Sequence, residues 1–430
     1  MSMTSSSSST TPLADDHQAA NTLVSLVTWP LRRLLSRLLR GVTCGSITIT
    51  LPDRQRLEGR GALPGPQASI QFVRWRAIAR LALRGDIGLA ASYRDGDWSS
   101  PDLTALIEFG IANEAGWGDA LDARWPARML HRLLHMARSN TRRGSRDNIA
   151  FHYDLGNAFY GLWLDRGMQY SGAPFVNGVN ESLEDAQAEK LRRVLALLEP
   201  ERLAEGARIL EIGCGWGALA VELARLPPSA SVVGLTLSKE QLAYAEARVA
   251  AAGEQDRVDL RLQDYRDVEG EYDRIASIEM LEAVGERYWP VYFETLRKRL
   301  KSSGVAVVQV ITIADEHFEH YRRGTDFIQR FIFPGGMLPS TAAMRTHAAQ
   351  AGLTFDVAET FGLGYARTLV EWRERFFAAW PAIEALGFDA SFKRLWEYYL
   401  CYCEAGFRSG RVDVGLYRLA HADVEGSASA

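Results

Sequence analysis

A short stretch at residues 208–217 constrains the fold of this chain more than any other. It reads Arg-Ile-Leu-Glu-Ile-Gly-Cys-Gly-Trp-Gly, an apolar strand pattern that ends in three closely spaced glycines, and a helical pattern follows at once from Ala218. Glycine allows a sharp turn from strand to helix and lets a ligand approach the backbone without a Cβ in the way. The stretch therefore predicts the first strand–helix turn of a Rossmann-like sheet, where nucleotide-type ligands bind.

The spacing of the glycines indicates which ligand. Gly213, Gly215 and Gly217 form G-x-G-x-G, whereas dinucleotide-binding proteins carry G-x-G-x-x-G. Glu211, just before the turn, is placed to face a cationic amino acid. We therefore expect S-adenosylmethionine rather than the NAD of an oxidoreductase, and an ordinary strand-to-helix turn without a ligand is the alternative.

Strand and helix patterns alternate along the segment that contains this turn. Such alternation implies a largely parallel sheet with helices on both faces, so the predicted fold class is α/β. Aromatic-rich helical patterns over residues 370–407 predict a helical C-terminal lid region. The expected strands cover residues 209–212, 231–235, 258–262, 274–278 and 305–310.

A length of 430 residues is too great for one ordinary domain. The first residues are rich in serine and threonine and predict a disordered tail. The expected parts are a tail at 1–22, a smaller α+β domain at 23–146 with a half-buried strand near 47–51, an α/β domain at 147–421 and a tail at 422–430.

The net charge of −4 gives no general attraction to nucleic acid, but arginines are concentrated in two segments without acidic residues, 21–52 and 123–146. This indicates local contact with an anionic surface, or two solvated helix faces. In the first segment, leucines recur at helical spacing opposite the arginines, which is typical of a helix in a membrane interface or of one docked on the next domain. They are Leu31, Leu34, Leu35, Leu38 and Leu39.

The cysteines and the apolar runs indicate the compartment. No uninterrupted apolar run is long enough to cross a bilayer. The four cysteines form neither a disulfide framework nor a paired zinc pattern, which fits a reducing, cytoplasmic compartment and predicts no metal. They are Cys44, Cys214, Cys401 and Cys403.

Several further motifs, in order along the chain, resemble those of the cyclopropane fatty acid and mycolic acid synthases, a family of S-adenosylmethionine-dependent methyltransferases. The resemblance is clearest from about Ile149 to Phe407, and the region before it is similar to the extra N-terminal domain of bacterial cyclopropane synthases. Besides the glycine turn, the motifs are Ile-Ala-Phe-His-Tyr-Asp-Leu-Gly-Asn at 149–157, Met-Gln-Tyr-Ser at 168–171, Val-Gly-Leu-Thr-Leu-Ser at 233–238, Leu-Gln-Asp-Tyr-Arg-Asp at 262–267 and Phe-Ile-Phe-Pro-Gly-Gly at 331–336.

The resemblance implies a Rossmann-like class I methyltransferase that uses S-adenosylmethionine. The implied substrate is the cis double bond of an unsaturated acyl chain, usually in an intact membrane phospholipid, and the implied product is a cyclopropane fatty acid. It also implies a lipid-binding or dimerisation role for the N-terminal domain, a homodimer as a possible assembly, and peripheral association with the inner face of the membrane. No nucleic-acid partner is expected.

The resemblance assigns the donor site residue by residue. The glycines surround the amino acid portion of the donor, the residues after the second and third strands hold its ribose and adenine, and a Tyr-Ser pair closes over it. A complete donor site argues against a lipid-binding protein without activity. The predicted donor residues are Tyr170, Ser171, Glu211, Gly213, Gly215, Gly217, Thr236, Leu237, Gln241, Asp264 and Tyr265.

For proton removal, the family implies a bound bicarbonate held by Glu, His, Tyr, Cys and backbone amides. Glu282 and Tyr365 match the Glu and the Tyr. Gly172 stands where the family usually has Cys, Gln309 where many members have His, and Glu279 adds a carboxylate where many have Gly. We expect proton removal to need Glu282, either directly or through bicarbonate.

These departures bear on the product rather than on methyl transfer. The alternative to ring closure is C-methylation that leaves a methyl- or methylene-branched chain. Cys403 matches a cysteine proposed as catalytic in the family and is counted with Glu282 and Tyr365 as a predicted catalytic residue, although its apolar helical neighbours favour a buried structural thiol.

Overall fold

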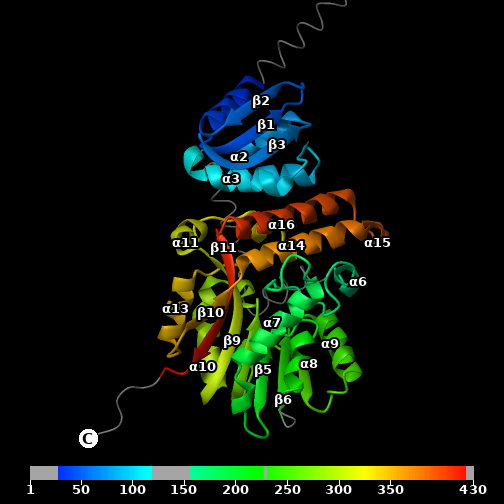
Figure 1. Cartoon of the computed structure of the whole chain (residues 1–430), viewed down its shortest axis with the longest axis vertical. Helices are drawn as coiled ribbons and strands as arrows, with labels where there is room; N and C mark the ends of the chain where they lie inside the picture. The colour runs from blue at the N-terminus through cyan, green and yellow to red at the C-terminus, as the bar shows by residue number, and fades with distance from the viewer. Residues whose placement is uncertain (1–27, 119–154, 227–229, 423–430) are drawn as a thin grey trace, which may run out of the picture.

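The computed structural model describes residues 28–118, 155–226 and 230–422. These residues form two domains, a small N-terminal one and a larger one built on a central sheet, with two long helices between them (Figure 1). The arginine-rich segment 123–146, the first part of the motif at 149–157 and most of the two predicted tails lie outside the described residues.

The larger domain is organised around a seven-stranded sheet with the order β10-β11-β9-β8-β5-β6-β7. Neighbouring strands from β9 through β7 are parallel, whereas β11 is antiparallel to both β9 and β10. The predicted strands are confirmed as β5 to β9, but β10 and β11 were not predicted. The strands are β5 (Arg208–Ile212), β6 (Ser231–Thr236), β7 (Val258–Leu262), β8 (Tyr272–Ile278), β9 (Leu300–Ile313), β10 (Asp356–Thr360) and β11 (Val412–Ala420).

Helices cover both faces of this sheet, as alternating strands and helices require. Successive side chains of a strand point to opposite faces, and Ile209 and Leu210 of β5 accordingly belong to different apolar clusters. This doubly wound α/β arrangement confirms the predicted Rossmann-like fold. The cluster of Ile209 includes side chains from α7 (Leu183–Leu197), α8 (Ala218–Ala224) and α9 (Lys239–Ala251), and that of Leu210 includes α10 (Trp289–Arg299) and α13 (Thr341–Gln350).

The N-terminal domain is a small α+β unit, as predicted. Its four-stranded sheet has the order β2-β1-β3-β4, and β1 is the strand expected near residues 47–51. The elements are a helix over residues 28–40, β1 (Cys44–Thr50), β2 (Arg56–Arg60), β3 (Leu63–Phe72), α2 (Trp75–Arg94), β4 (Trp98–Ser99) and α3 (Leu103–Trp117).

The helix over residues 28–40 decides between the two interpretations of its leucine face. Leu35 is 2% exposed and Leu38 is 7% exposed, and both are packed inside the N-terminal domain. Leu35 and Leu38 are therefore core residues of a docked helix, whereas Leu31, Leu34 and Leu39 are half-buried. Trp29, which is 57% exposed, lies on the outer side with Arg33, Arg37 and Arg40, whereas Arg32 is half-buried and pairs with Asp53.

The two domains meet across α14 (Gly362–Ala378) and α16 (Ala390–Arg408), with α2 and α3 packed against α16 (Figure 1). The Tyr93 hydroxyl donates to Glu397 at 2.7 Å across this joint. Arg373 forms a buried ion pair with Glu404 and donates to the Thr104 hydroxyl at 2.8 Å. Polar bonds thus fix the N-terminal domain on the lid helices. The shorter helices of the lid region are α11 (Asp315–Tyr321), α12 (Phe327–Phe331) and α15 (Trp380–Ala385).

Among the described residues, no helix is both long and apolar enough to span a membrane.

Candidate active site

A cavity of about 1110 Å³ opens at the carboxyl ends of the central strands and continues between the lid helices into the N-terminal domain. In an open α/β sheet, ligands bind at this edge. The predicted residues that line the cavity are Tyr170, Ser171, Glu211, Gly213, Gly215, Thr236, Leu237, Gln241, Tyr265, Glu282, Tyr365 and Cys403.

The three glycines of the turn after β5 have backbone conformations in the left-handed region. Gly213, Gly215 and Gly217 have φ values of 84°, 53° and 83°, which side chains tolerate poorly. A Cβ on Gly215 would meet nothing within 4 Å and would project into the cavity, whereas one on Gly217 would lie 2.9 Å from the Cβ of Ala245 on α9. Gly215 therefore keeps space for a ligand, and Gly217 allows two helices to pack.

Glu211 ends β5 beneath this turn and is 3% exposed. Its Oε2 atom has no hydrogen-bond partner within the described parts of the chain. Burial raises the pKa of this carboxyl to about 8. A buried carboxyl without a partner is costly, so this position is prepared for a cationic or donor group that a ligand would supply.

The next strand contributes a buried polar pair. The Thr236 hydroxyl donates to the Gln241 side-chain oxygen at 2.9 Å, at the start of α9. After β7, Tyr265 lines the cavity, whereas Asp264 does not, and the Asp264 carboxylate pairs with Arg266 at 2.5 Å. The predicted roles of these residues toward ribose and adenine stay predictions.

Sequence reasoning missed a buried lysine beside the donor pocket. Lys190 on α7 is 1% exposed, and its Nζ donates to Ser171 Oγ and to the Gln187 side-chain oxygen, both at 2.6 Å. Burial lowers the pKa of Lys190 to about 8, opposed by the charges of Glu279 and Asp165. The missed signal is that Gln187 and Lys190 share the buried stripe of α7 with apolar residues at helical spacing.

Glu279, directly after β8, is the centre of a hydrogen-bond network. Its Oε1 accepts from the backbone N–H of Gly172 and from Nε2 of Gln309, each at 2.8 Å. Its Oε2 accepts from the Tyr365 hydroxyl at 2.8 Å. The residues that depart from the family pattern, Gly172, Gln309 and Glu279, therefore bind one another.

Glu282 lies beside this network in a short helix after β8. Its Oε1 accepts from the backbone N–H of Ile311 at 2.5 Å, and its Oε2 has no partner within the described parts of the chain. Burial, and then the charge of Glu279, raise the pKa of Glu282 to about 8. The site thus holds two buried carboxyl groups in different environments.

The packing around Gly172 explains why no larger residue stands there. A Cβ on Gly172 would lie 2.4 Å from the ring of Tyr365, which is closer than real contacts allow. Tyr365 also stacks on Phe407, with ring centroids 4.4 Å apart. The missing side chain of Gly172 lets the tyrosine ring lie where its hydroxyl reaches Glu279.

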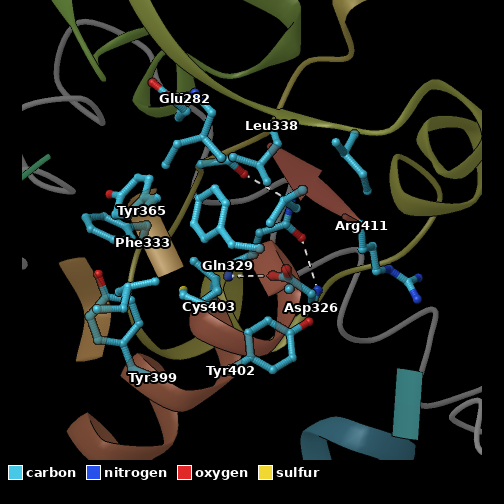
Figure 2. A pocket seen from close by; sticks show the side chains of 18 of the residues that line it. Glu282, Asp326, Gln329, Phe333, Leu338, Tyr365, Tyr399, Tyr402, Cys403 and Arg411 are labelled. Atoms are coloured by element: carbon cyan, nitrogen blue, oxygen red, sulfur yellow. Dashed lines mark hydrogen bonds between the residues drawn. The ribbon is translucent and has the colours of Figure 1, made fainter. Parts of the chain in front are cut away.

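Aromatic rings and Cys403 form the wall beyond the carboxyl groups (Figure 2). Figure 2 shows Glu282 at the top of the view and Tyr365, Phe333 and Tyr399 along its left side. Cys403 lies nearer the middle of the view. Burial raises the pKa of the Cys403 thiol far above its usual range. A protonated thiol is not a nucleophile, so the structural interpretation of Cys403 is the better supported.

Several known proteins are similar to this chain. The family model for mycolic acid cyclopropane synthetase matches residues 140–416. Over 363 residues, the chain is 40% identical to the tuberculostearic acid methyltransferase UfaA1 of Mycobacterium tuberculosis, which covers 82% of this chain and 84% of that protein. Over 347 residues, it is 35% identical to the cyclopropane-fatty-acyl-phospholipid synthase of Escherichia coli K12, with coverages of 79% and 84%.

A solved structure of a similar protein also matches this chain. The mycolic acid cyclopropane synthase CmaA1, complexed with SAH and CTAB, superimposes with a TM-score of 0.58 at 30% identity. The match covers 64% of this chain and 97% of that one.

Proposed function

The chain belongs to the mycolic acid cyclopropane synthetase family and is a methyltransferase, and from this premise we propose that it transfers a methyl group from S-adenosylmethionine to the cis double bond of an unsaturated acyl chain. Its fold is that of the Rossmann-like class I methyltransferases. One observation carries the proposal: the glycine turn and the two buried carboxyl groups line the same aromatic-walled cavity.

The donor fits the pocket at the glycine turn. S-adenosylmethionine supplies an electrophilic methyl group on a sulfonium. The unpartnered oxygen of Glu211 suits the ammonium of its amino acid portion, and the open space at Gly215 suits its close approach. Tyr170 and Ser171 line the same cavity, with Ser171 held by Lys190. We assign these residues, with those predicted after β6 and β7, to donor binding.

The part of the cavity beyond the donor pocket is suited to methylation of an alkene. The double bond attacks the methyl carbon, the carbon–sulfur bond breaks, and a positive charge is left on the chain. Water must be kept away from that charge, and aromatic faces stabilise it. Tyr365 and Phe333 provide such faces, while Glu279 and Glu282 provide groups that can remove a proton from the new methyl group.

For the product, we propose the methylene-branched chain over the ring. The chain is 40% identical to a relative named tuberculostearic acid methyltransferase and 35% identical to one named cyclopropane-fatty-acyl-phospholipid synthase. A hydride shift first gives the more substituted cation, which then loses a proton from the methyl group to form a methylene. A saturated methyl branch needs a reductant that the proposed reaction does not supply.

The cyclopropane remains the second candidate. The identity of 35% to the Escherichia coli synthase supports it. Ring closure and methylene formation remove a proton from the same methyl group, so the same two carboxyl groups serve either outcome.

We further propose that the N-terminal domain binds lipid. The cavity continues between α3, β1 and the helix over 28–40, where its wall is apolar and includes Leu38, Ile49 and Phe109. Such a wall suits an acyl chain and supports lipid binding over a purely dimerising role. The predicted homodimer stays a prediction.

Peripheral association with the membrane follows from the same proposal. Arg33, Arg37 and Arg40 lie on the outer side of a docked helix. Basic residues near an anionic bilayer contribute about 1 kcal/mol each, and less at high salt. Sedimentation with anionic vesicles should weaken as salt rises, and equal binding to neutral and anionic vesicles would contradict the electrostatic part.

The test of the function is mass spectrometry of lipids. Purified protein, S-adenosylmethionine and vesicles of monounsaturated phospholipid should give acyl chains heavier by one methylene unit. Ozonolysis then separates the products, because a methylene branch is cleaved and a cyclopropane is not. Unchanged chains at full donor occupancy would contradict the proposal.

A further inference from the structure

We propose that Glu279 is the catalytic base of the reaction and that its carboxylate takes the place of any diffusible anion. The inference rests on the proposed function, because it names the group that receives the proton lost from the transferred methyl. With Glu279 as the base, the reaction needs no bicarbonate.

The hydrogen bonds around Glu279 carry the inference. The Gly172 N–H, the Gln309 amide and the Tyr365 hydroxyl all donate to its two oxygens at 2.8 Å. Gln309 is held in turn by a bond from its Nε2 to the Gly172 carbonyl at 3.0 Å. These are the donors that a small carboxylate or bicarbonate would need, and a side chain of the protein already occupies them.

The backbone at this position is unusual as well. Glu279 has a φ of 49°, in the left-handed region that non-glycine residues rarely adopt. Such strain persists where the surrounding structure imposes it and is concentrated at functional sites. The missing side chain of Gly172 makes room for the Tyr365 ring. Both features serve to place one carboxylate among three donors.

The charges in the pocket indicate which of the two acids is ionised. Burial raises the pKa of both Glu279 and Glu282. Only for Glu279 is this rise opposed by three hydrogen bonds together with the charge of Lys190, and the charge of Glu279 itself raises the pKa of Glu282. Glu279 therefore ionises first, and Glu282 keeps its proton near neutral pH.

Removal of a proton from the transferred methyl group conserves atoms and charge with these groups. The Glu279 carboxylate removes a proton from the methyl group that has just been transferred to the chain. The electron pair of that C–H bond forms the carbon–carbon bond that neutralises the cation, as a methylene double bond or as the third side of a ring. Glu279 is left as a neutral acid, the like charge beside Glu282 is gone, and Glu282, which lines the cavity, can then release its own proton to solvent once the product has left.

Glu279→Gly tests the inference because it removes the carboxylate and leaves its three hydrogen-bond donors, which we call the cradle, unoccupied. The backbone should not be disturbed, because glycine accepts a positive φ. The three donors would remain, so turnover should fall by about 10²–10⁴, as for the loss of a general base, and should recover when bicarbonate or formate is added. Glu279→Gln is the matched control, because its amide fills the cradle: it should be as slow and should not be rescued. Wild-type turnover should not depend on bicarbonate.

Donor affinity and thermal unfolding, measured on both variants, show that they are folded. The inference is overturned if the wild-type protein requires bicarbonate, if Glu279→Gly turns over at the wild-type rate without an added anion, or if neither anion rescues the folded variant. Failure of the proposed function is separate, because it appears as an inactive wild-type protein.

Discussion

The donor pocket and the proton-removal site are each centred on a buried glutamate at the end of a central strand, but their surroundings differ. Glu211, near the end of β5, is left with one oxygen without a partner in the described structure. Glu279, after β8, accepts hydrogen bonds on both oxygens. A buried acid that lacks a partner is suited to a ligand that brings one, whereas a fully bonded carboxylate is held ready to receive a proton.

The largest effect should come from blocking the donor pocket. Gly215→Val would place a branched side chain in the open space beside the turn and would force a residue with a φ of 53° out of its conformation. We expect loss of donor binding, and with it of all turnover, in a folded protein. Calorimetry with S-adenosylmethionine measures this.

Gly253→Val is the matched control for Gly215. Gly253 has a φ of 75° and open surroundings, and it follows α9 outside the cavity wall. A comparable loss of donor affinity in both variants would assign the effect to backbone strain rather than to the pocket.

The second largest effect, on donor affinity, should come from Glu211. In the empty protein, Glu211 is protonated below its pKa of about 8, and binding of an ammonium requires the carboxylate. Donor affinity should therefore rise with pH between about 6 and about 7.5, by up to tenfold per unit, with release of a proton. Glu211→Gln should weaken binding by about 1.5–3 kcal/mol and flatten this dependence. A pH-independent wild-type affinity would contradict the assignment.

A smaller effect is expected at the second acid of the proton-removal site. Glu282→Gln resembles the neutral acid but cannot pass a proton on, so turnover should fall by about tenfold, at the low end of acid–base effects, while donor affinity is kept. Rapid-quench kinetics with vesicles would measure it. A fall as large as that of Glu279→Gln would make Glu282 the base instead.

The smallest effect should come from crowding the Tyr365 ring. A methyl group at Gly172 would overlap that ring at 2.4 Å, and overpacking of this kind costs about 1–3 kcal/mol. Gly172→Ala should lower the free energy of unfolding by that amount and slow turnover by displacing the hydroxyl from Glu279. Gly110→Ala, with nothing within 4 Å of its Cβ, is the control in denaturant titrations and should not destabilise.

The sequence predicted best what depends on local pattern. The glycine turn and the strands β5 to β9 follow from glycine spacing and apolar runs, and all were placed within a few residues except for the ends of β9. The strands β10 and β11 were missed. β10 is short and mostly exposed, and its pairing partner β11 lies more than fifty residues further along the chain.

The contacts of the site could not be predicted in the same way. Glu279 stood out in the sequence only as an extra carboxylate, because its partners Gly172, Gln309 and Tyr365 are distant in the chain and are brought together by the fold. Lys190 could have been noticed as a charge on an otherwise apolar stripe of α7. Ser171 was predicted as a donor-site residue, but its bond to Lys190 was not, because Ser171 lies outside that helix.

The most direct test of the central claim follows the hydrogens of the transferred methyl. S-adenosylmethionine with a trideuterated methyl group would be incubated with the protein and vesicles of monounsaturated phospholipid, and the acyl chains analysed by mass spectrometry. We predict that the added carbon keeps two of its three deuterium atoms, because a carboxylate beside the new methyl removes the third. An added carbon that keeps all three would contradict the account, since the proton would then have come from the chain itself.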